Sequence, residues 1–138
     1  MIAVDTNVIA SLLLPTSQHT EAAMNLLQTD REWVAPLLWR SEFCNILATS
    51  VRHDRMTHEQ AAEALASAEE LMDAGEFRVP TAEVLKTAIE SRCTGYDCEF
   101  VVLAKDLGLK LVTLDKAILA AFPDVTEPLS KYDPSSAA

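Results

Sequence analysis

Acidic side chains follow, or lie just inside, four well-separated apolar segments of the chain. A carboxylate at the carboxyl end of a buried strand lies where open α/β sheets bind their ligands. Several carboxylates that converge there repel one another unless a positive charge compensates them. The compensator that oxygen ligands favour is a hard divalent cation such as Mg²⁺ or Mn²⁺. The acidic residues in question are Asp5, Glu42, Asp97 and Asp115.

This set of residues predicts metal-dependent hydrolysis of a phosphodiester. Such a reaction needs a water that loses its proton near neutral pH, and it needs neutralisation of the charge on the phosphate and on the leaving oxygen. Carboxylate-bound Mg²⁺ supplies all of these. Because magnesium keeps several of its own waters, a handful of carboxylates suffices and His or Cys ligands are not required. The histidines His19, His53 and His58 lie in polar contexts and are expected to face solvent.

Each acid also has a purely structural interpretation. Asp5 and Asp115 could cap the helices that follow them, and Asp97 could stabilise the first turn of its own helix. Glu42 differs because it falls within a helix whose neighbouring side, at Phe43, is apolar. Independent caps would not require three aspartates at one edge of a sheet, so the joint arrangement favours a site.

The composition indicates one compact domain with an acidic surface. The chain has 138 residues, of which 49% are hydrophobic, and this is long enough to bury a core. No apolar run approaches the roughly 18 residues of a membrane span, and no signal peptide is recognised, so we expect a cytoplasmic protein with no membrane partner. The formal net charge of −10 disfavours tight, nonspecific binding of nucleic acid and suits a basic protein partner.

Short apolar runs alternate with helical patterns, which predicts an α/β domain with a short central parallel sheet covered on both faces. The clearest helix begins at Thr57, with Gln60 at capping-box spacing and Gly75 as its C-terminal stop. We expect the domain to span residues 1–128 and residues 129–138 to form a flexible C-terminal tail. The predicted strands lie at 1–4, 33–35, 77–79, 110–113 and 125–126.

Four blocks of the chain, in this order and spacing, match those of a known family. They are Asp5 to Val8, Ser41 to Leu47, Tyr96 to Ala104 and Leu111 to Lys116. Through them the chain resembles the PIN domain, from Met1 to about Val125, and within that family the VapC-type toxins of bacterial toxin–antitoxin pairs.

The resemblance implies a three-layer α/β/α fold and an endoribonuclease that cuts RNA with Mg²⁺ or Mn²⁺. It implies a homodimer that is neutralised by a cognate antitoxin protein, often through an Arg placed among the carboxylates. The second helix and the helix from Thr57 offer apolar faces for such a dimer. By position, the catalytic and metal-binding residues would be Asp5, Glu42, Asp97 and Asp115, with Asn7 and Thr113 as supporting polar neighbours.

Other classes of protein fit the sequence less well. Phosphatases of the haloacid-dehalogenase type carry a second Asp two positions after the first, where this chain has Asn7, which cannot transfer a proton. A receiver domain would have adjacent acids at its first strand and a Lys at the end of a late strand. The main alternative is a catalytically silent PIN-like module that binds a protein partner, although all four acids of the site are present.

Overall fold

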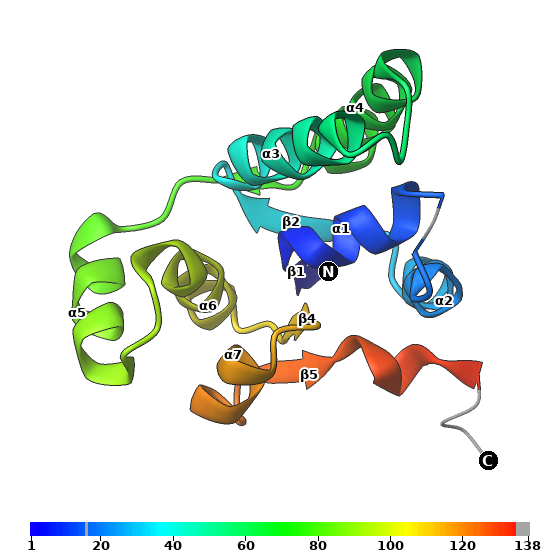
Figure 1. Cartoon of the computed structure of the whole chain (residues 1–138). Coiled ribbons are helices and arrows are strands. Elements are labelled where there is room, and N and C mark those ends of the chain that lie inside the picture. Colours follow the sequence, from blue (N-terminus) through cyan, green and yellow to red (C-terminus); the bar gives the residue numbers. More distant parts are fainter. Residues whose placement is uncertain (16, 135–138) are drawn as a thin grey trace.

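The computed structural model describes residues 1–15 and 17–134, which fold around a parallel sheet (Figure 1). The strand order is β3-β2-β1-β4-β5, so the first strand lies in the middle of the sheet. Every pairing in this order is parallel, as the alternation of strands and helices predicted. The strands are β1 (Ile2–Val4), β2 (Trp33–Pro36), β3 (Glu76–Phe77), β4 (Leu111–Thr113) and β5 (Thr126–Pro128).

Helices connect each strand to the next. Among the helices of the described residues, none is long and apolar enough to cross a membrane. The α-helices are α1 (Thr6–Leu13), α2 (Thr20–Thr29), α3 (Trp39–Arg52), α4 (His58–Met72), α5 (Thr81–Ser91), α6 (Gly95–Leu107) and α7 (Lys116–Ala121), and a short 3₁₀ helix, η1 (Leu129–Tyr132), follows the last strand.

The helices cover both faces of the sheet. On one face α6 contacts β1, β2 and β4, and α5 packs against α6. α1 lies on the other face, where it contacts α2, α3 and α4, and Figure 1 shows these two groups on either side of the strands. This division follows from the strand order, because the chain first adds strands on one side of β1 and then returns to add β4 and β5 on the other, and crossovers between parallel strands are almost always right-handed. The predicted three-layer α/β/α fold is confirmed.

The core lies between the sheet and its helices and fixes the rotation of the helices that carry acidic residues. Trp39, Phe43 and Leu47 occupy one buried stripe of α3, which leaves Glu42 at the border of that stripe. On α6 a buried run from Phe100 to Ala104 follows Asp97. Burial of one such large side chain contributes about 1.5–3 kcal/mol, so packing holds both acidic turns in place.

The helix predicted from Thr57 forms with its full capping box: the Thr57 hydroxyl accepts from the Gln60 backbone and the Gln60 side chain accepts from the Thr57 backbone. The helix ends at Met72, however, before Gly75. A Cβ at position 75 would stand 2.0 Å from the carbonyl oxygen of Trp33. The glycine is therefore required for the close approach of the chain to β2, and its expected role as the helix stop is wrong.

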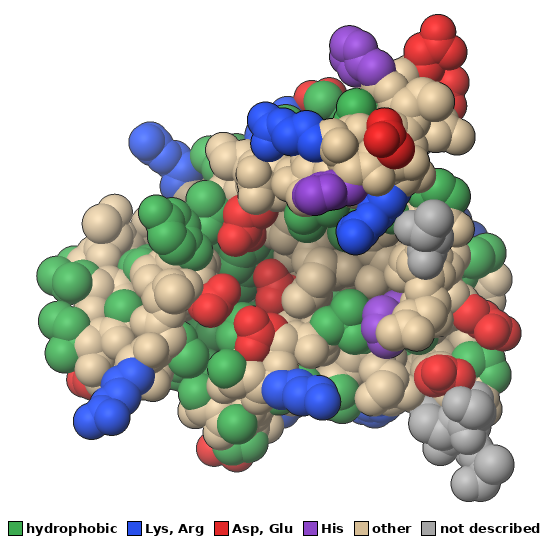
Figure 2. Space-filling view, in the orientation of Figure 1, with side chains coloured by type: hydrophobic (Ala, Val, Ile, Leu, Met, Phe, Trp, Pro, Cys, Tyr) green, Lys and Arg blue, Asp and Glu red, His purple; other side chains and the backbone are tan. Residues whose placement is uncertain are grey.

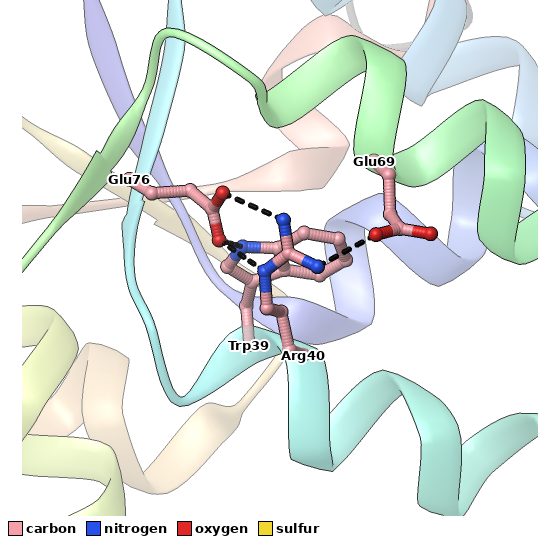
Figure 3. A network of polar contacts seen from close by, with 4 residues as sticks. All are labelled: Trp39, Arg40, Glu69 and Glu76. Atoms are coloured by element: carbon pink, nitrogen blue, oxygen red, sulfur yellow. Dashed lines mark hydrogen bonds and ion pairs between the residues drawn. The ribbon is translucent and has the colours of Figure 1, made fainter.

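A polar network ties the start of α3 to the edge of the sheet (Figure 3). The Arg40 guanidinium donates to both carboxylate oxygens of Glu76, from Nε at 2.6 Å and from Nη2 at 2.8 Å. Its Nη1 donates to Glu69 on α4 at 2.7 Å, and the indole of Trp39 donates to Glu76 at 2.9 Å. A bidentate Arg–carboxylate pair has fixed geometry, so the network sets the position of the turn that carries Glu42.

The segment after Pro128 differs from the flexible tail that was expected. Residues 129–132 form η1, in which Leu129 is fully buried. η1 packs against α2, and the Asn25 side chain donates to the carbonyl oxygen of Tyr132 at 3.0 Å. The prediction failed because Leu129 is the single large apolar residue between two polar stretches, and one apolar residue makes no periodic signal. Residues 135–138 lie outside the described part of the chain.

Candidate functional site at the carboxyl edge of the sheet

Asp5 directly follows the central strand, β1. It is the most buried of the four predicted acids, with an exposed fraction of 7%. One carboxylate oxygen accepts from the backbone N–H of Thr6 at 2.8 Å, which makes Asp5 the N-cap of α1. The other accepts from the Thr113 hydroxyl at 2.7 Å. The pKa of Asp5 is raised to about 6, chiefly by burial and also by the charges of Glu42 and Asp97, while the two hydrogen bonds oppose the shift.

Asp115 reaches the same edge because β4 is the neighbour of β1 in the sheet. Its backbone N–H donates to the Thr113 hydroxyl oxygen at 3.0 Å, so one hydroxyl connects the loops that carry Asp5 and Asp115. The Asp115 carboxylate caps α7 by accepting from the backbone of Ala117 and Ile118. Asp115 is thus a helix cap, as its structural interpretation predicted. Both capping hydrogen bonds use the same carboxylate oxygen, so the second oxygen is available to a ligand.

Asn7 joins the same two loops. Its side-chain oxygen accepts from the backbone N–H of Leu114 at 3.3 Å, and its amide nitrogen lies 3.5 Å from the second oxygen of Asp5. Asn7 thereby holds the start of α1 against the loop after β4.

Glu42 lies in the first turn of α3, half-buried. One of its carboxylate oxygens accepts from the Thr6 hydroxyl at 2.7 Å, a contact between residues that are 36 positions apart. Burial raises the pKa of Glu42, and the charges of Asp97 and Glu99 add to the shift. Glu42 is therefore close enough to the α6 acids to interact with them through charge.

Asp97 lies in the first turn of α6, where its backbone N–H donates to the capping hydroxyl of Thr94 at 3.0 Å. Burial raises the pKa of Asp97, and the charge of Asp115 raises it further. Charge interactions thus connect the four predicted acids into one electrostatic cluster: Glu42 and Asp97 act on Asp5, Asp97 acts on Glu42, and Asp115 acts on Asp97. Figure 2 shows acidic side chains gathered near the middle of one face of the molecule.

Nothing cationic within the described residues neutralises this cluster. The ion pairs there involve the N-terminus, Arg40 and Lys131, and none includes Asp5, Glu42, Asp97 or Asp115. Partial compensation comes from the fold, because each of the four acids caps a helix or lies in its first turn. The N-terminus of a helix carries a partial positive charge.

The chemistry of this donor set fits a hard divalent cation, since the side chains offer carboxylate oxygens and no thiolate or imidazole. Among the described residues, no three acidic, His or Cys side chains are already arranged to hold an ion together. Magnesium keeps several waters and needs only one or two direct carboxylates. The set is thus suited in chemistry to Mg²⁺ or Mn²⁺, with water completing the coordination.

Two residues of the site were not singled out from the sequence. Thr6, which orients Glu42, resembles any residue at the start of a helix. Glu99 resembles a solvent-facing helical residue, yet it is partly buried and influences Glu42. The only sequence signal was that both belong to the two blocks that contain Asp5 and Asp97.

The fold and the site together place the protein in a class. It is an α/β protein of three layers, with an acidic site suited to metal at the carboxyl edge of its parallel sheet. Within that class, the chain belongs to the PIN-domain family, whose model matches residues 2–124. The predicted family resemblance is confirmed.

Individual relatives agree with this assignment. Over 132 residues the chain is 30% identical to Ribonuclease VapC3 of Pyrobaculum aerophilum, a match that covers 92% of this chain and 98% of that protein. The crystal structure of PAE2754 from Pyrobaculum aerophilum matches with a TM-score of 0.74 at 22% identity, over 99% of this chain and 97% of that one. The crystal structure of FitAcB from Neisseria gonorrhoeae matches with a TM-score of 0.63 at 18% identity, over 91% and 96%. The two structural likenesses show a shared fold.

Proposed function

We propose that this protein is a Mg²⁺- or Mn²⁺-dependent endoribonuclease. The observation that carries the proposal is the cluster of Asp5, Glu42, Asp97 and Asp115, which gathers at one edge of the sheet without a cationic partner among the described residues. Membership of the PIN-domain family and the likeness to a protein named Ribonuclease VapC3 support RNA as the substrate.

The surrounding hydroxyls prepare the carboxylates for this role. The Thr113 hydroxyl fixes one oxygen of Asp5, and the Thr6 hydroxyl fixes one oxygen of Glu42. Both hydroxyls are buried, so water does not compete for them. Asp5, Glu42, Asp97 and Asp115 would hold the cation, which when bound supplies an activated water and neutralises charge on the phosphate.

We further propose that the protein is the toxin of a toxin–antitoxin pair and acts in the cytoplasm, where RNA and an antitoxin would meet it. The likeness to Ribonuclease VapC3 supports this assignment. The net charge of −10 and the uncompensated acidic cluster suit an antitoxin that is basic where it contacts the site. An Arg side chain of that partner would pair with two carboxylate oxygens at once.

A homodimer is also proposed, through a surface other than the helix faces considered from the sequence. The apolar face of α2 packs against α1 and η1, and α4 packs against α1, α3 and β2, which leaves Ala61, Ala62 and Leu65 of α4 lining an open cavity beside α3. Leu85 and Ile89 remain 62% and 71% exposed one turn apart on α5. If α5 carries the dimer contact, Ile89→Glu yields monomers in sedimentation experiments, and a dimer that persists in this variant excludes that surface.

The alternative is a catalytically silent module that binds a protein partner. The two functions differ in one measurement, which is cleavage of a mixed RNA pool by the purified full-length chain with Mg²⁺, with Mn²⁺ and with EDTA. For an endoribonuclease, cutting requires metal and falls in Asp5→Asn by more than the roughly 10- to 100-fold typical of outer-shell changes at metal sites.

The matched control is Asp106→Asn, which removes an exposed carboxylate from α6, the same helix as Asp97. This variant should cut at the wild-type rate. Cutting that continues in EDTA, or that survives in Asp5→Asn, contradicts the proposed site. A complete absence of cutting with every metal supports the silent module.

A further inference from the structure

A cavity of about 200 Å³ lies beside the acidic cluster, on the side of β3 and α5. Its apolar wall includes Leu37, at the turn that leads into α3, and Phe77, at the end of β3. Val79 and Val84 complete this wall. Pockets for drug-sized ligands enclose about 300–1,000 Å³, so this smaller cavity suits a single ring system.

The polar wall of the cavity consists of Glu99, Arg78 and Thr81. Glu99 is partly buried, and it makes no hydrogen bond or ion pair to any described residue. Arg78, the basic side chain of the lining, is exposed and likewise has no partner among the described residues. A carboxylate and a guanidinium that line one cavity without pairing to each other are available to a ligand that carries both N–H donors and negative charge.

The cavity and the candidate site share two parts of the fold, α6 and the turn that leads into α3. Glu99 lies two residues after Asp97 on α6, and Leu37 lies on the turn that positions α3 and Glu42. The charge of Glu99 reaches Glu42, which places the two carboxylates in one neighbourhood. This neighbourhood leads us to consider a nucleotide whose phosphate occupies the acidic site and whose base enters this cavity.

Single-stranded RNA is recognised by bases that stack on aromatic rings or guanidinium planes and that form hydrogen bonds along their Watson–Crick edges. Phe77 and Arg78 supply the stacking groups at this cavity. Glu99 supplies a carboxylate, which accepts N–H donors from bases. Guanine alone among the four bases presents two adjacent donors on that edge, N1–H and N2–H, which match the two oxygens of one carboxylate.

We propose that this cavity binds a guanine base next to the cleaved phosphodiester, with Glu99 accepting from N1–H and N2–H and the apolar wall and Arg78 enclosing the ring. The proposal rests on the proposed ribonuclease function, because it names the base that the same site selects. Glu99 is thus a specificity residue that touches the substrate and lies outside the set of four metal-binding acids.

The first test is to sequence the ends produced from a random RNA pool by the wild type, by Glu99→Gln and by Glu90→Gln. Glu90 is exposed on α5 and does not line the cavity, so its variant is the matched control. Guanine should be enriched at one position beside the cut for the wild type and the control, and should lose its enrichment in Glu99→Gln. A wild type without guanine enrichment, or an enrichment that Glu99→Gln leaves unchanged, overturns the proposal.

A chemical substitution sharpens this test. Inosine lacks the N2 amino group, so its use in place of the enriched guanine removes one of the two donors. A good bidentate contact to a base discriminates by about 5- to 150-fold, and we expect kcat/KM of the wild type to fall about 10-fold with inosine. Glu99→Gln should cut both substrates at similar rates, and an equal response of wild type and variant to inosine contradicts the contact.

A second readout is independent of cleavage. In EDTA, NMR spectra of the full-length protein should show shifts of the Val79 and Val84 methyl groups on titration with guanosine, weaker shifts with inosine, and none in Glu99→Gln. Methyl shifts without any RNA cutting would refute the ribonuclease and retain the guanine cavity. RNA cutting without methyl shifts and without base preference would refute the cavity and retain the ribonuclease.

Discussion

At the scale of single residues, the site depends on hydroxyl groups that hold buried carboxylates. Asp5 loses solvation by burial, and neighbouring acids oppose its charge, which is why its pKa rises to about 6. Thr113 is fully buried and both donates to Asp5 and accepts from the backbone of Asp115. Variants of Asp5 measure the free-energy cost of burying its charge, and variants of Thr113 measure how much its hydroxyl stabilises the fold.

The first prediction concerns Asp5 in protein without metal. Because its pKa is raised from 3.8 to about 6 in the folded state, the folded protein holds this proton more tightly than the unfolded chain. Protonation of Asp5 therefore stabilises the folded state relative to the unfolded chain. This stabilisation is fully present below pH 3.8 and is lost as the pH rises through about 6. Asp5→Asn should therefore exceed the wild type in free energy of unfolding at about pH 8, by up to about 3 kcal/mol.

Urea unfolding in EDTA, from about pH 4.5 to about pH 8, measures this difference. The advantage of Asp5→Asn should shrink as the pH falls, and Asp106→Asn should follow the wild type at every pH. A gap that does not change with pH, or an Asp5→Asn protein that is the less stable of the two at the alkaline end, contradicts the pKa assignment.

The second prediction concerns Thr113. Thr113→Val has nearly the same shape but removes the donor to Asp5, and a buried acceptor that loses its partner costs about 1–3 kcal/mol. The variant should be destabilised by that amount at neutral pH, and its RNA cleavage should fall because Asp5 is no longer oriented. Thr113→Ser should restore both properties. If Thr113→Ser and Thr113→Val behave alike, the hydroxyl does not have this role.

At the scale of secondary-structure elements, the acids are gathered by the N-terminal ends of helices. α1 and α7 are capped by Asp5 and Asp115, and α3 and α6 carry Glu42 and Asp97 in their first turns. Because helices that connect parallel strands run back across the sheet, their N-terminal ends lie at the carboxyl edge of the strands. Anything that moves α3 or α6 therefore changes the cluster.

The third prediction tests the network at the start of α3. Arg40→Lys keeps the charge but cannot form the bidentate pair with Glu76, so its melting temperature should fall and its cleavage rate should fall with it. Glu69→Gln removes only the exposed arm of the network, and exposed ion pairs contribute little, so this variant should melt with the wild type. Equal melting temperatures for the wild type and Arg40→Lys would show that the network does not anchor α3.

The fourth prediction tests the segment after β5. Leu129 is fully buried in η1, and replacement of a buried Leu by Ala typically costs about 2–5 kcal/mol. Leu129→Ala should lose stability in that range in urea unfolding. Met24→Ala, at an exposed position of α2, is the matched control and should change stability by less than about 0.5 kcal/mol. A loose tail would make both substitutions neutral.

At the scale of the whole molecule, an acidic protein is proposed to cut a polyanion. The net charge of −10 gives little general attraction for RNA. In the proposed function, substrate capture therefore depends on local features, which are a cation at the carboxylate cluster and the cavity beside it. The same reasoning makes the metal a ligand whose binding stabilises the fold.

The fifth prediction is that millimolar Mg²⁺ or Mn²⁺ raises the melting temperature of the wild type, because a ligand that binds only the folded state stabilises it by mass action. At ten times the dissociation constant, the gain in free energy of unfolding is about 1.4 kcal/mol. Asp5→Asn should show a smaller rise, and NaCl at equal ionic strength should not reproduce the effect. An identical rise in wild type and Asp5→Asn places the cation elsewhere.

The sequence by itself determined the alternation of strands and helices, the capping box at Thr57 and the four candidate acids, because apolar periodicity and local capping patterns are properties of neighbouring residues. The family follows from four short blocks in order. Tertiary structure alone decided the contacts between distant residues: the Thr6 hydroxyl on Glu42, the approach of Gly75 to Trp33, the burial of Leu129 against α2 and the cavity that contains Glu99. Such contacts depend on how the layers pack, and no local pattern in the chain encodes them.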